Sequence, residues 1–291
     1  MVEWGIQMGM LSKRRRKQIS VELSRNKAII AAAAFLALIA LLSIFAFLSP
    51  YDPDAIDVLH KMEGPSAAHW LGTDDLGRDY LTRVLYGGRI SLTVGLIAML
   101  ISTSIGVVVG TVSGYFGGWV DGILMRVVDI LSSIPWLILV TVISIFFKPG
   151  LTAIITVIGL FTWMSIARLV RAETLSVKER EYVLYAEAVD QSKLFTIVRH
   201  VLPSVLPTII IAATTGIASA IMTESSLSFL GFGVQPPMSS WGSMLNRAQG
   251  MLGRAPYMAI VPGVMIILTV YSFNKIGDLI RVIAEPRATS M

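Results

Sequence analysis

The chain has 291 residues, of which 54% are hydrophobic and only 15% are charged. Soluble domains carry about 25% charged residues, so this composition indicates an integral membrane protein. The lack of cysteine excludes disulfides and cysteine metal sites. The net charge of +5 gathers beside hydrophobic stretches, without the aromatic-interleaved basic stripe typical of nucleic-acid binding, so no nucleic acid is expected as a partner.

Hydrophobic segments of membrane-spanning length recur along the chain. A helix needs about 20 largely apolar residues to cross a bilayer. Six segments qualify, at 28–48, 90–112, 130–147, 151–167, 201–223 and 257–274. Because Pro135 is tolerated in the first turn of a helix, the third span is expected to begin near Ser133, with 120–129 as an amphipathic lead-in. The sequence therefore predicts an all-α integral membrane protein with six transmembrane helices.

Basic residues predict the orientation. Segment 1–27 holds a cluster that the positive-inside rule keeps in the cytoplasm, namely Lys13, Arg14, Arg15, Arg16, Lys17, Arg25 and Lys27. An even number of spans then places both termini in the cytoplasm. The cluster and the apolar run after it resemble a signal peptide, but 28–48 is long enough to span. Residues 49–53 are Ser-Pro-Tyr-Asp-Pro, without a small-residue cleavage pattern, so we expect an uncleaved first span.

Residues 28–291 are expected to form one membrane domain with three segments outside the bilayer. Two of these are external, 49–89 and 225–256, and one is cytoplasmic, 168–200. A connector of a few residues would suffice to join two spans. The length and charge of 168–200 therefore indicate a surface on which a cytoplasmic partner docks.

The cytoplasmic segment 168–200 has the pattern of two short helices. Apolar residues recur at helical spacing in each half and predict one apolar stripe per helix, formed by Tyr182, Ala186 and Val189 and by Leu194, Val198 and Val201. The polar stretch 190–193 between the halves suits a turn, with Ser192 as the N-cap of the second helix.

Signatures of catalysis and metal binding are missing from the sequence. There is no Gly-x-x-x-x-Gly-Lys-Ser/Thr phosphate loop and no His-Glu-x-x-His. We therefore expect no enzyme activity, no metal and no cofactor in this chain. Glu224, at the external end of the fifth span, is interpreted as an interfacial carboxylate or helix cap in preference to an ion pathway. Small residues in the spans are interpreted as helix packing in preference to substrate contacts, namely Gly106, Gly110, Ala212, Ala213, Gly216 and Ser219.

Several short motifs occur in a fixed order along the chain. They are Leu-Gly-Thr-Asp-Asp-Leu-Gly-Arg-Asp (71–79), Tyr-Gly-Gly-Arg-Ile-Ser-Leu (86–92), Ser-Gly-Tyr-Phe-Gly-Gly-Trp-Val-Asp (113–121), Leu-Met-Arg-Val-Val-Asp-Ile-Leu (124–131), Leu-Ser-Phe-Leu-Gly-Phe-Gly-Val-Gln-Pro-Pro (227–237) and Ser-Trp-Gly-Ser-Met-Leu (240–245). The set resembles the permease subunits of prokaryotic ATP-binding-cassette (ABC) importers for peptides. The branch is that of dipeptide, oligopeptide and nickel systems, and the subunit is the C type.

The resemblance also points to a coupling motif in the cytoplasmic segment. In that family the motif is Glu-Ala-Ala, three residues, Gly, and later Leu-Pro. Counting back from Leu202-Pro203 puts Glu-Ala-Ala at 184–186 and Gly at Asp190, so three of these four positions differ. Aspartate can adopt the left-handed backbone that glycine would supply. The residues implied to contact an ATPase are Leu184, Tyr185, Ala186, Glu187, Ala188, Val189, Asp190, Gln191 and Ser192.

The resemblance implies the type I ABC importer fold in the plasma (inner) membrane of a prokaryote. The expected partners are a second homologous permease, two ABC ATPases that use ATP and Mg, an extracytoplasmic substrate-binding protein at the external segments, and membrane lipid. Peptide is the expected solute, while nickel, a small sugar or a glutathione-like ligand stays open. Two other classes also stay open, a secondary transporter or channel without an ATPase, and a membrane scaffold that transports nothing.

Overall fold

The structure, a computed structural model, describes residues 27–136, 138–140, 142 and 150–284. These residues form helices joined by loops and turns, and they contain no strand. The helices are α2 (Lys27–Ile44), η1 (Phe45–Leu48), η2 (Val58–His60), α3 (Tyr80–Phe116), α4 (Gly118–Ser132), α6 (Leu151–Lys178), α7 (Glu181–Ala188), α8 (Lys193–Thr196), the π-helical η3 (Ile197–Val201), α9 (Leu202–Phe229), α10 (Trp241–Ala248), η4 (Gln249–Met251) and α11 (Tyr257–Ala284). The expected all-α class is confirmed.

Five helical stretches in the described residues are long and apolar enough to cross a membrane. They are Lys27–Leu48, Tyr80–Phe116, Leu151–Lys178, Lys193–Phe229 and Tyr257–Ala284. Each contains one of the predicted spans, so five of the six predicted spans coincide with such helices. Most of the helices extend beyond the predicted bounds because polar residues at their ends continue the same helical hydrogen bonding. Helix α3 begins at Tyr80 instead of residue 90, and α6 continues to Lys178 instead of residue 167.

The third predicted span, 130–147, is not one continuous helix in the structure. Helix α4 ends at Ser132, the chain turns through 133–135, and helical conformation resumes at Trp136. Pro135 has no N–H with which to continue the ladder of α4, which accounts for the break. The lead-in expected at 120–129 is instead the body of α4. Residues 137, 141 and 143–147 of this span, like residues 148–149 and the basic segment up to residue 26, lie outside the described residues.

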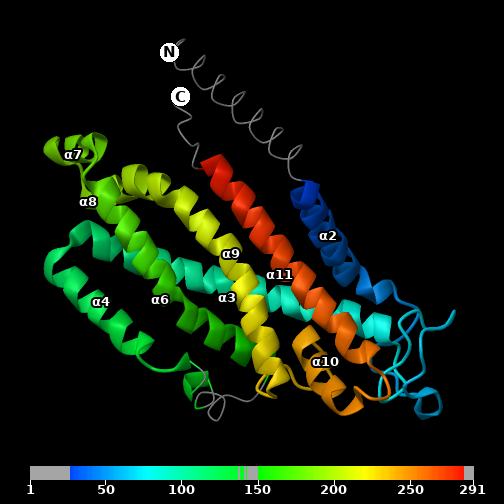
Figure 1. Cartoon of the computed structure of the whole chain (residues 1–291). Coiled ribbons are helices and arrows are strands. Elements are labelled where there is room, and N and C mark those ends of the chain that lie inside the picture. Colours follow the sequence, from blue (N-terminus) through cyan, green and yellow to red (C-terminus); the bar gives the residue numbers. More distant parts are fainter. Residues whose placement is uncertain (1–26, 137, 141, 143–149, 285–291) are drawn as a thin grey trace.

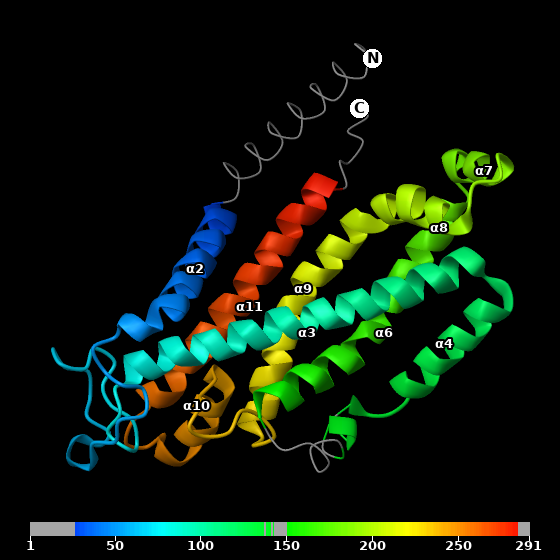
Figure 2. The same cartoon turned by 180° about the vertical axis from the view of Figure 1, so that it is seen from behind.

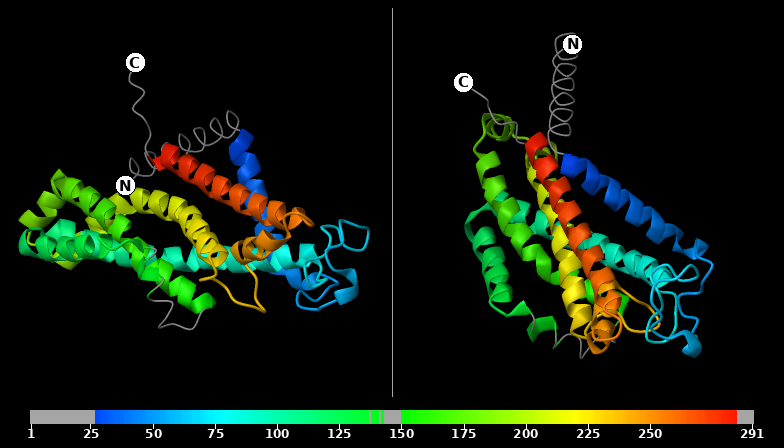
Figure 3. Two further views of the ribbon diagram at one scale, coloured as in Figure 1. Left: turned by 60° about the horizontal axis from the view of Figure 1, so that its bottom comes forward. Right: turned by 45° about the vertical axis from the view of Figure 1, so that its right-hand side comes forward.

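The helices run back and forth between two ends of the bundle. In Figures 1 and 2 the start of α2, the end of α11 and helix α7 lie at one end. Helix α10 and the loop around 49–79 lie at the other end. The left view of Figure 3 shows α3 along one side of the molecule, with α9 and α11 beside it. The predicted cytoplasmic and external segments thus occupy opposite ends.

Close packing of α3 against α6 depends on glycine. A methyl group at Gly110 would lie 2.5 Å from the Ala167 carbonyl oxygen, and one at Gly106 would lie 2.7 Å from Ile166. Side chains larger than hydrogen would therefore separate these helices. The interpretation of Gly106 and Gly110 as packing residues is confirmed.

The loop before α3 is held by buried charges. Asp74 accepts hydrogen bonds from the backbone N–H and Nε of Arg78, at 3.0 and 2.7 Å. Asp79 caps α3 by accepting from the N–H of Thr82 at 2.8 Å. Gly77 has φ +78°, and a side chain there would collide with the Asp57 carbonyl oxygen. The motif at 71–79 is therefore a folded cap on α3, with little of its charge exposed to solvent.

The two segments that were predicted to be external meet at this end of the bundle. The Tyr257 hydroxyl at the start of α11 donates to the carbonyl oxygens of Glu63 and Thr73, at 2.9 and 2.7 Å. The indole N–H of the fully buried Trp241 in α10 donates to the Val84 carbonyl oxygen at 3.0 Å. Residues far apart in the sequence thus form one surface at this end of the bundle.

Candidate functional site

The segment outside the long helices is shorter than the predicted 168–200, because α6 continues to Lys178. Arg168 and Arg171 lie on α6 and form ion pairs with α4, to Asp129 at 3.0 Å and Asp121 at 2.5 Å respectively. These arginines therefore brace two helices against each other. The segment that projects from the bundle consists of α7, the turn 189–192 and α8.

The turn after α7 has the hydrogen bonds of a Schellman motif. The N–H of Gln191 donates to the Ala186 carbonyl oxygen, and the N–H of Asp190 donates to that of Glu187, both at 3.1 Å. Asp190 has φ +56°, so it takes the left-handed conformation that glycine favours. The bend expected from the coupling motif is therefore present despite the aspartate. Ser192 caps α8 as predicted, accepting from the Phe195 N–H at 3.4 Å.

The predicted apolar stripes are only partly correct. In α7 the buried side chains are Val183 and Ala186, whereas Tyr182 and Val189 are exposed. The predicted stripe runs over residues 182–189, whereas α7 has only about two turns. Val183 and Ala186, which are three residues apart, are enough to pack this short helix on the bundle. In the second half Val201 is buried while Leu194 and Val198 are exposed.

Exposed apolar side chains instead form what we call the coupling surface: Tyr182, Leu184, Tyr185, Val189, Leu194, Phe195 and Val198. Tyr185 and Leu194 are the most exposed, at 70% and 72%. All the residues implied to contact an ATPase are exposed except Ala186, which is buried and faces the bundle. Tyr182 also fixes α7 to α9 through its hydroxyl, 2.9 Å from Ser204 Oγ.

A polar cavity of about 460 Å³ lies beside the turn. The residues that line it come from the ends of α3 and α6 and from the turn and its flanks. They are Tyr115, Phe116, Lys178, Glu187, Asp190, Gln191, Ser192 and Lys193. The Lys178 ammonium lies 5.6 Å from the Tyr115 ring centroid, and that of Lys193 lies 5.6 Å from the Phe116 ring centroid. Cation–π contacts therefore connect α6 and α8 to the end of α3.

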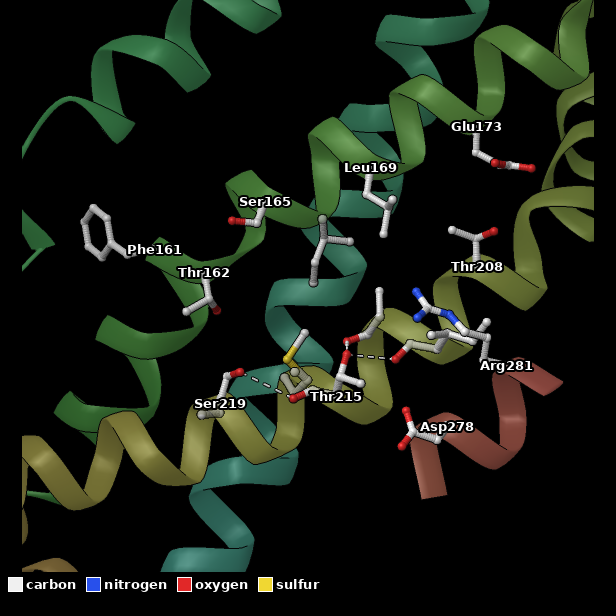
Figure 4. Close-up of a pocket in the computed structure, with 17 residues that line it drawn as sticks. Phe161, Thr162, Ser165, Leu169, Glu173, Thr208, Thr215, Ser219, Asp278 and Arg281 are labelled. Atoms are coloured by element: carbon white, nitrogen blue, oxygen red, sulfur yellow. Dashed lines mark hydrogen bonds between the residues drawn. The ribbon is translucent and has the colours of Figure 1, made fainter. Parts of the chain in front are cut away.

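A larger cavity of about 630 Å³ opens between α3, α6, α9 and α11. Figure 4 shows hydroxyl groups from α6 and α9 along it, contributed by Thr162, Ser165, Thr208, Thr215 and Ser219. Charged side chains line it as well, from Glu173 on α6 and from Asp278 and Arg281 on α11. Ala212, Gly216 and Ser219, interpreted from sequence as packing residues, line this cavity too. Gly216 has both roles, since a methyl group there would also collide with Met99.

Glu224 has surroundings that the sequence interpretation missed. It is 0% exposed and accepts hydrogen bonds from Ser91 Oγ at 3.1 Å and Ser228 Oγ at 2.7 Å. Ser91 Oγ in turn accepts from the Trp241 N–H at 3.2 Å. The cap of α10 is Ser240, so Glu224 does not cap that helix. It links α3, α9 and α10 through buried hydrogen bonds. The serines that follow Glu224 in the sequence, at 225, 228 and 240, were the available signal.

The fold and these surfaces define a helical membrane transport subunit. Residues 106–290 match the family described as binding-protein-dependent transport system inner membrane component. Residues 17–65 match the N-terminal transmembrane domain of oligopeptide transport permease C. The chain belongs to the family of binding-protein-dependent transport system inner membrane components and is a multi-pass inner-membrane permease of the ABC importer type.

Individual relatives agree with this assignment. The chain is 38% identical over 268 residues to the glutathione transport system permease protein GsiD of Pectobacterium atrosepticum, covering 91% of this chain and 89% of that protein. It is 39% identical over 258 residues to GsiD of Shigella sonnei, covering 88% of this chain and 85% of that protein. A chain of the MetNI methionine ABC transporter, solved in an inward-facing conformation, shares the fold with a TM-score of 0.60 and 20% identity, over 70% of this chain and 97% of that chain.

Proposed function

We propose that this chain forms half of the translocation pathway of an ATP-driven importer for peptides or a peptide-like solute such as glutathione. Its partners are a second homologous permease, two ABC ATPase subunits that bind and hydrolyse ATP with Mg, and an extracytoplasmic binding protein. The chain itself binds no cofactor. The observation that carries the proposal is the coupling surface, exposed at the end of the bundle where α2 begins and α11 ends.

The coupling surface has the composition of a protein interface. Tyr185 and Phe195 are large, exposed aromatic side chains of the kind that anchor interfaces. Charged residues surround them, among them Glu181, Lys193 and Arg199, so this surface is unsuited to the lipid interior. A contiguous apolar patch that faces water marks a protein-binding site. Docking of the ATPase here would pass its movement through α7 to α6 and α9.

The cavity of Figure 4 is proposed as this chain's wall of the pathway. Its hydroxyl groups offer both hydrogen-bond donors and acceptors, which suits a polar, flexible solute without demanding one chemical structure. Among the described residues, the charged side chains that line the cavity are Glu173, Asp278 and Arg281, which lie in the C-terminal parts of α6 and α11. Hydroxyl groups supply the rest of its polar lining, which disfavours a proton- or sodium-coupled transporter. Recognition of the solute is therefore assigned to the binding protein, and nickel remains the alternative solute within this importer class.

Six spans with both termini in the cytoplasm fit the arrangement of the helices. The start of α2 and the end of α11 lie at the same end as α7. Helix α3 ends at the α7 end of the bundle and α6 begins at the opposite end, and α4 leads from the first toward the second (Figure 2). Residues around 49–79 and 230–256 form the external surface, which is proposed to receive the binding protein.

Co-purification from membranes tests this function. The tagged chain, extracted in mild detergent, is expected to bring down a second permease and an ABC ATPase with ATP-hydrolysing activity. Tyr185→Arg is expected to release the ATPase but retain the second permease, because Tyr185 is exposed and packs on little within the chain. A chain that stays alone under conditions preserving other ABC complexes would favour the secondary-transporter alternative.

A further inference from the structure

The turn between α7 and α8 carries an acidic residue where backbone geometry favours glycine. Asp190 has φ +56°, which costs an aspartate backbone free energy that a glycine does not lose. Asp190 also follows the C-terminus of α7, where the helix dipole disfavours negative charge. The conformation of the turn therefore does not account for an aspartate at this position.

The Asp190 carboxylate has no partner within the described part of the chain. Its side chain is exposed, accepts no hydrogen bond and forms no ion pair among those residues. Lys178 and Lys193 line the same cavity, but their ammonium groups lie over the rings of Tyr115 and Phe116. The carboxylate is thus left available to another molecule.

Its location indicates which molecule that is. Asp190 lies between Val189 and Leu194 of the coupling surface, so a protein covering these apolar side chains also covers the carboxylate. A covered carboxylate requires a cationic partner, since burial of an unpaired charge is strongly unfavourable.

We propose that Asp190 forms an ion pair with a lysine or arginine in the ATPase groove that receives this chain. The inference rests on the proposed docking of an ATPase to α7 and α8. The pair would make the interface selective, because an ATPase lacking the cation would leave Asp190 covered and unpaired. Asp190 is then a specificity determinant for the choice of ATPase.

The test measures how tightly the ATPase subunit binds the detergent-solubilised permease at low and high salt. Asp190→Gly and Asp190→Asn both tolerate the left-handed turn and remove the charge. Each is expected to weaken ATPase binding roughly tenfold at low salt and to flatten its salt dependence. An unchanged thermal midpoint shows that the permease itself is intact. Binding as tight and as salt-dependent as wild type in both variants would overturn the proposal.

Two further variants separate the possible failures. If Tyr185→Arg releases the ATPase while both Asp190 variants bind normally, the docking surface stands and only the ion pair is wrong. If Tyr185→Arg also binds normally, the docking itself is wrong. The permease variant Asp190→Lys is combined in turn with ATPase variants in which one lysine or arginine of the groove is replaced by glutamate. One of these combinations is expected to regain binding of the ATPase. Failure of every pair to regain binding would contradict a direct contact.

Discussion

Arg171 on α6 donates two hydrogen bonds to the carboxylate of Asp121 on α4, each 2.5 Å long. Ser113, in the last turn of α3, also bonds to this carboxylate. The contact therefore joins three helices at the end of the bundle that carries α7. Such bidentate pairs hold a guanidinium group in one fixed orientation.

Loss of the Arg171–Asp121 contact should destabilise the protein more than loss of the neighbouring ion pair between Arg168 and Asp129. Arg171→Ala is expected to lower the free energy of unfolding by about 1–2 kcal/mol, since the pair is bidentate and partly buried. Arg168→Ala, which breaks a more exposed pair with Asp129, should cost about 0–1 kcal/mol. Thermal unfolding in detergent measures both. Equal effects of the two substitutions would contradict the bracing role of Arg171.

Helix packing provides a matched pair of glycine substitutions. Gly110→Ala is expected to cost about 1–3 kcal/mol because the new methyl group would meet the Ala167 carbonyl oxygen. Gly122→Ala on α4 has no atom within 4 Å of the added methyl group. This control substitution should instead raise the free energy of unfolding by about 0.5–1 kcal/mol, because alanine is more favourable than glycine inside a helix. A tolerated Gly110→Ala would disprove the tight contact of α3 with α6.

Filling the cavity should block uptake without affecting assembly. Thr215→Trp combined with Ser219→Trp places two indoles in the cavity of Figure 4. ATP-driven uptake into proteoliposomes is expected to fall to a small fraction of wild type while the ATPase still co-purifies. Ile267→Trp, at an exposed position on α11, is the control and should transport normally. Normal uptake by the doubly substituted protein would exclude this cavity from the pathway.

The external loop should show a pH-dependent contact. Hydrogen bonding to Asp57, 2.7 Å away, raises the pKa of His60 above 6.5, and the same contact lowers the pKa of Asp57 below 3.8. The charged contact is therefore present between these two pKa values: it is lost as the pH rises through the raised pKa of His60, and also as the pH falls through the lowered pKa of Asp57. NMR titration of labelled histidine measures the His60 value directly.

Asp57→Asn is expected to return the His60 pKa toward its ordinary value. Asp52→Asn removes a nearby acidic residue that makes no contact with His60 and should leave the pKa unchanged. A His60 pKa that does not respond to Asp57→Asn would contradict the hydrogen bond between these side chains.

Local patterns predicted much of this fold, and long-range contacts account for what was missed. Span length and hydropathy located five helices, and turn chemistry located Asp190 and Ser192 correctly. The pairing of Arg171 with Asp121 and the serine environment of Glu224 join different helices, and no periodicity within one segment encodes them. The burial of Ala186, unlike its exposed neighbours, depends on which face of a two-turn helix packs inward, and the sequence does not reveal that face.

Site-specific photo-crosslinking tests the central claim most directly. A photoreactive amino acid at Tyr185 would lie on the coupling surface, and one at Ile267 would lie on an exposed face of α11. In native membranes that contain the whole transporter, position 185 is expected to give an adduct with the ABC ATPase and position 267 none. No ATPase adduct from position 185, in membranes where the ATPase co-purifies with the permease, would contradict ATPase docking at α7 and α8.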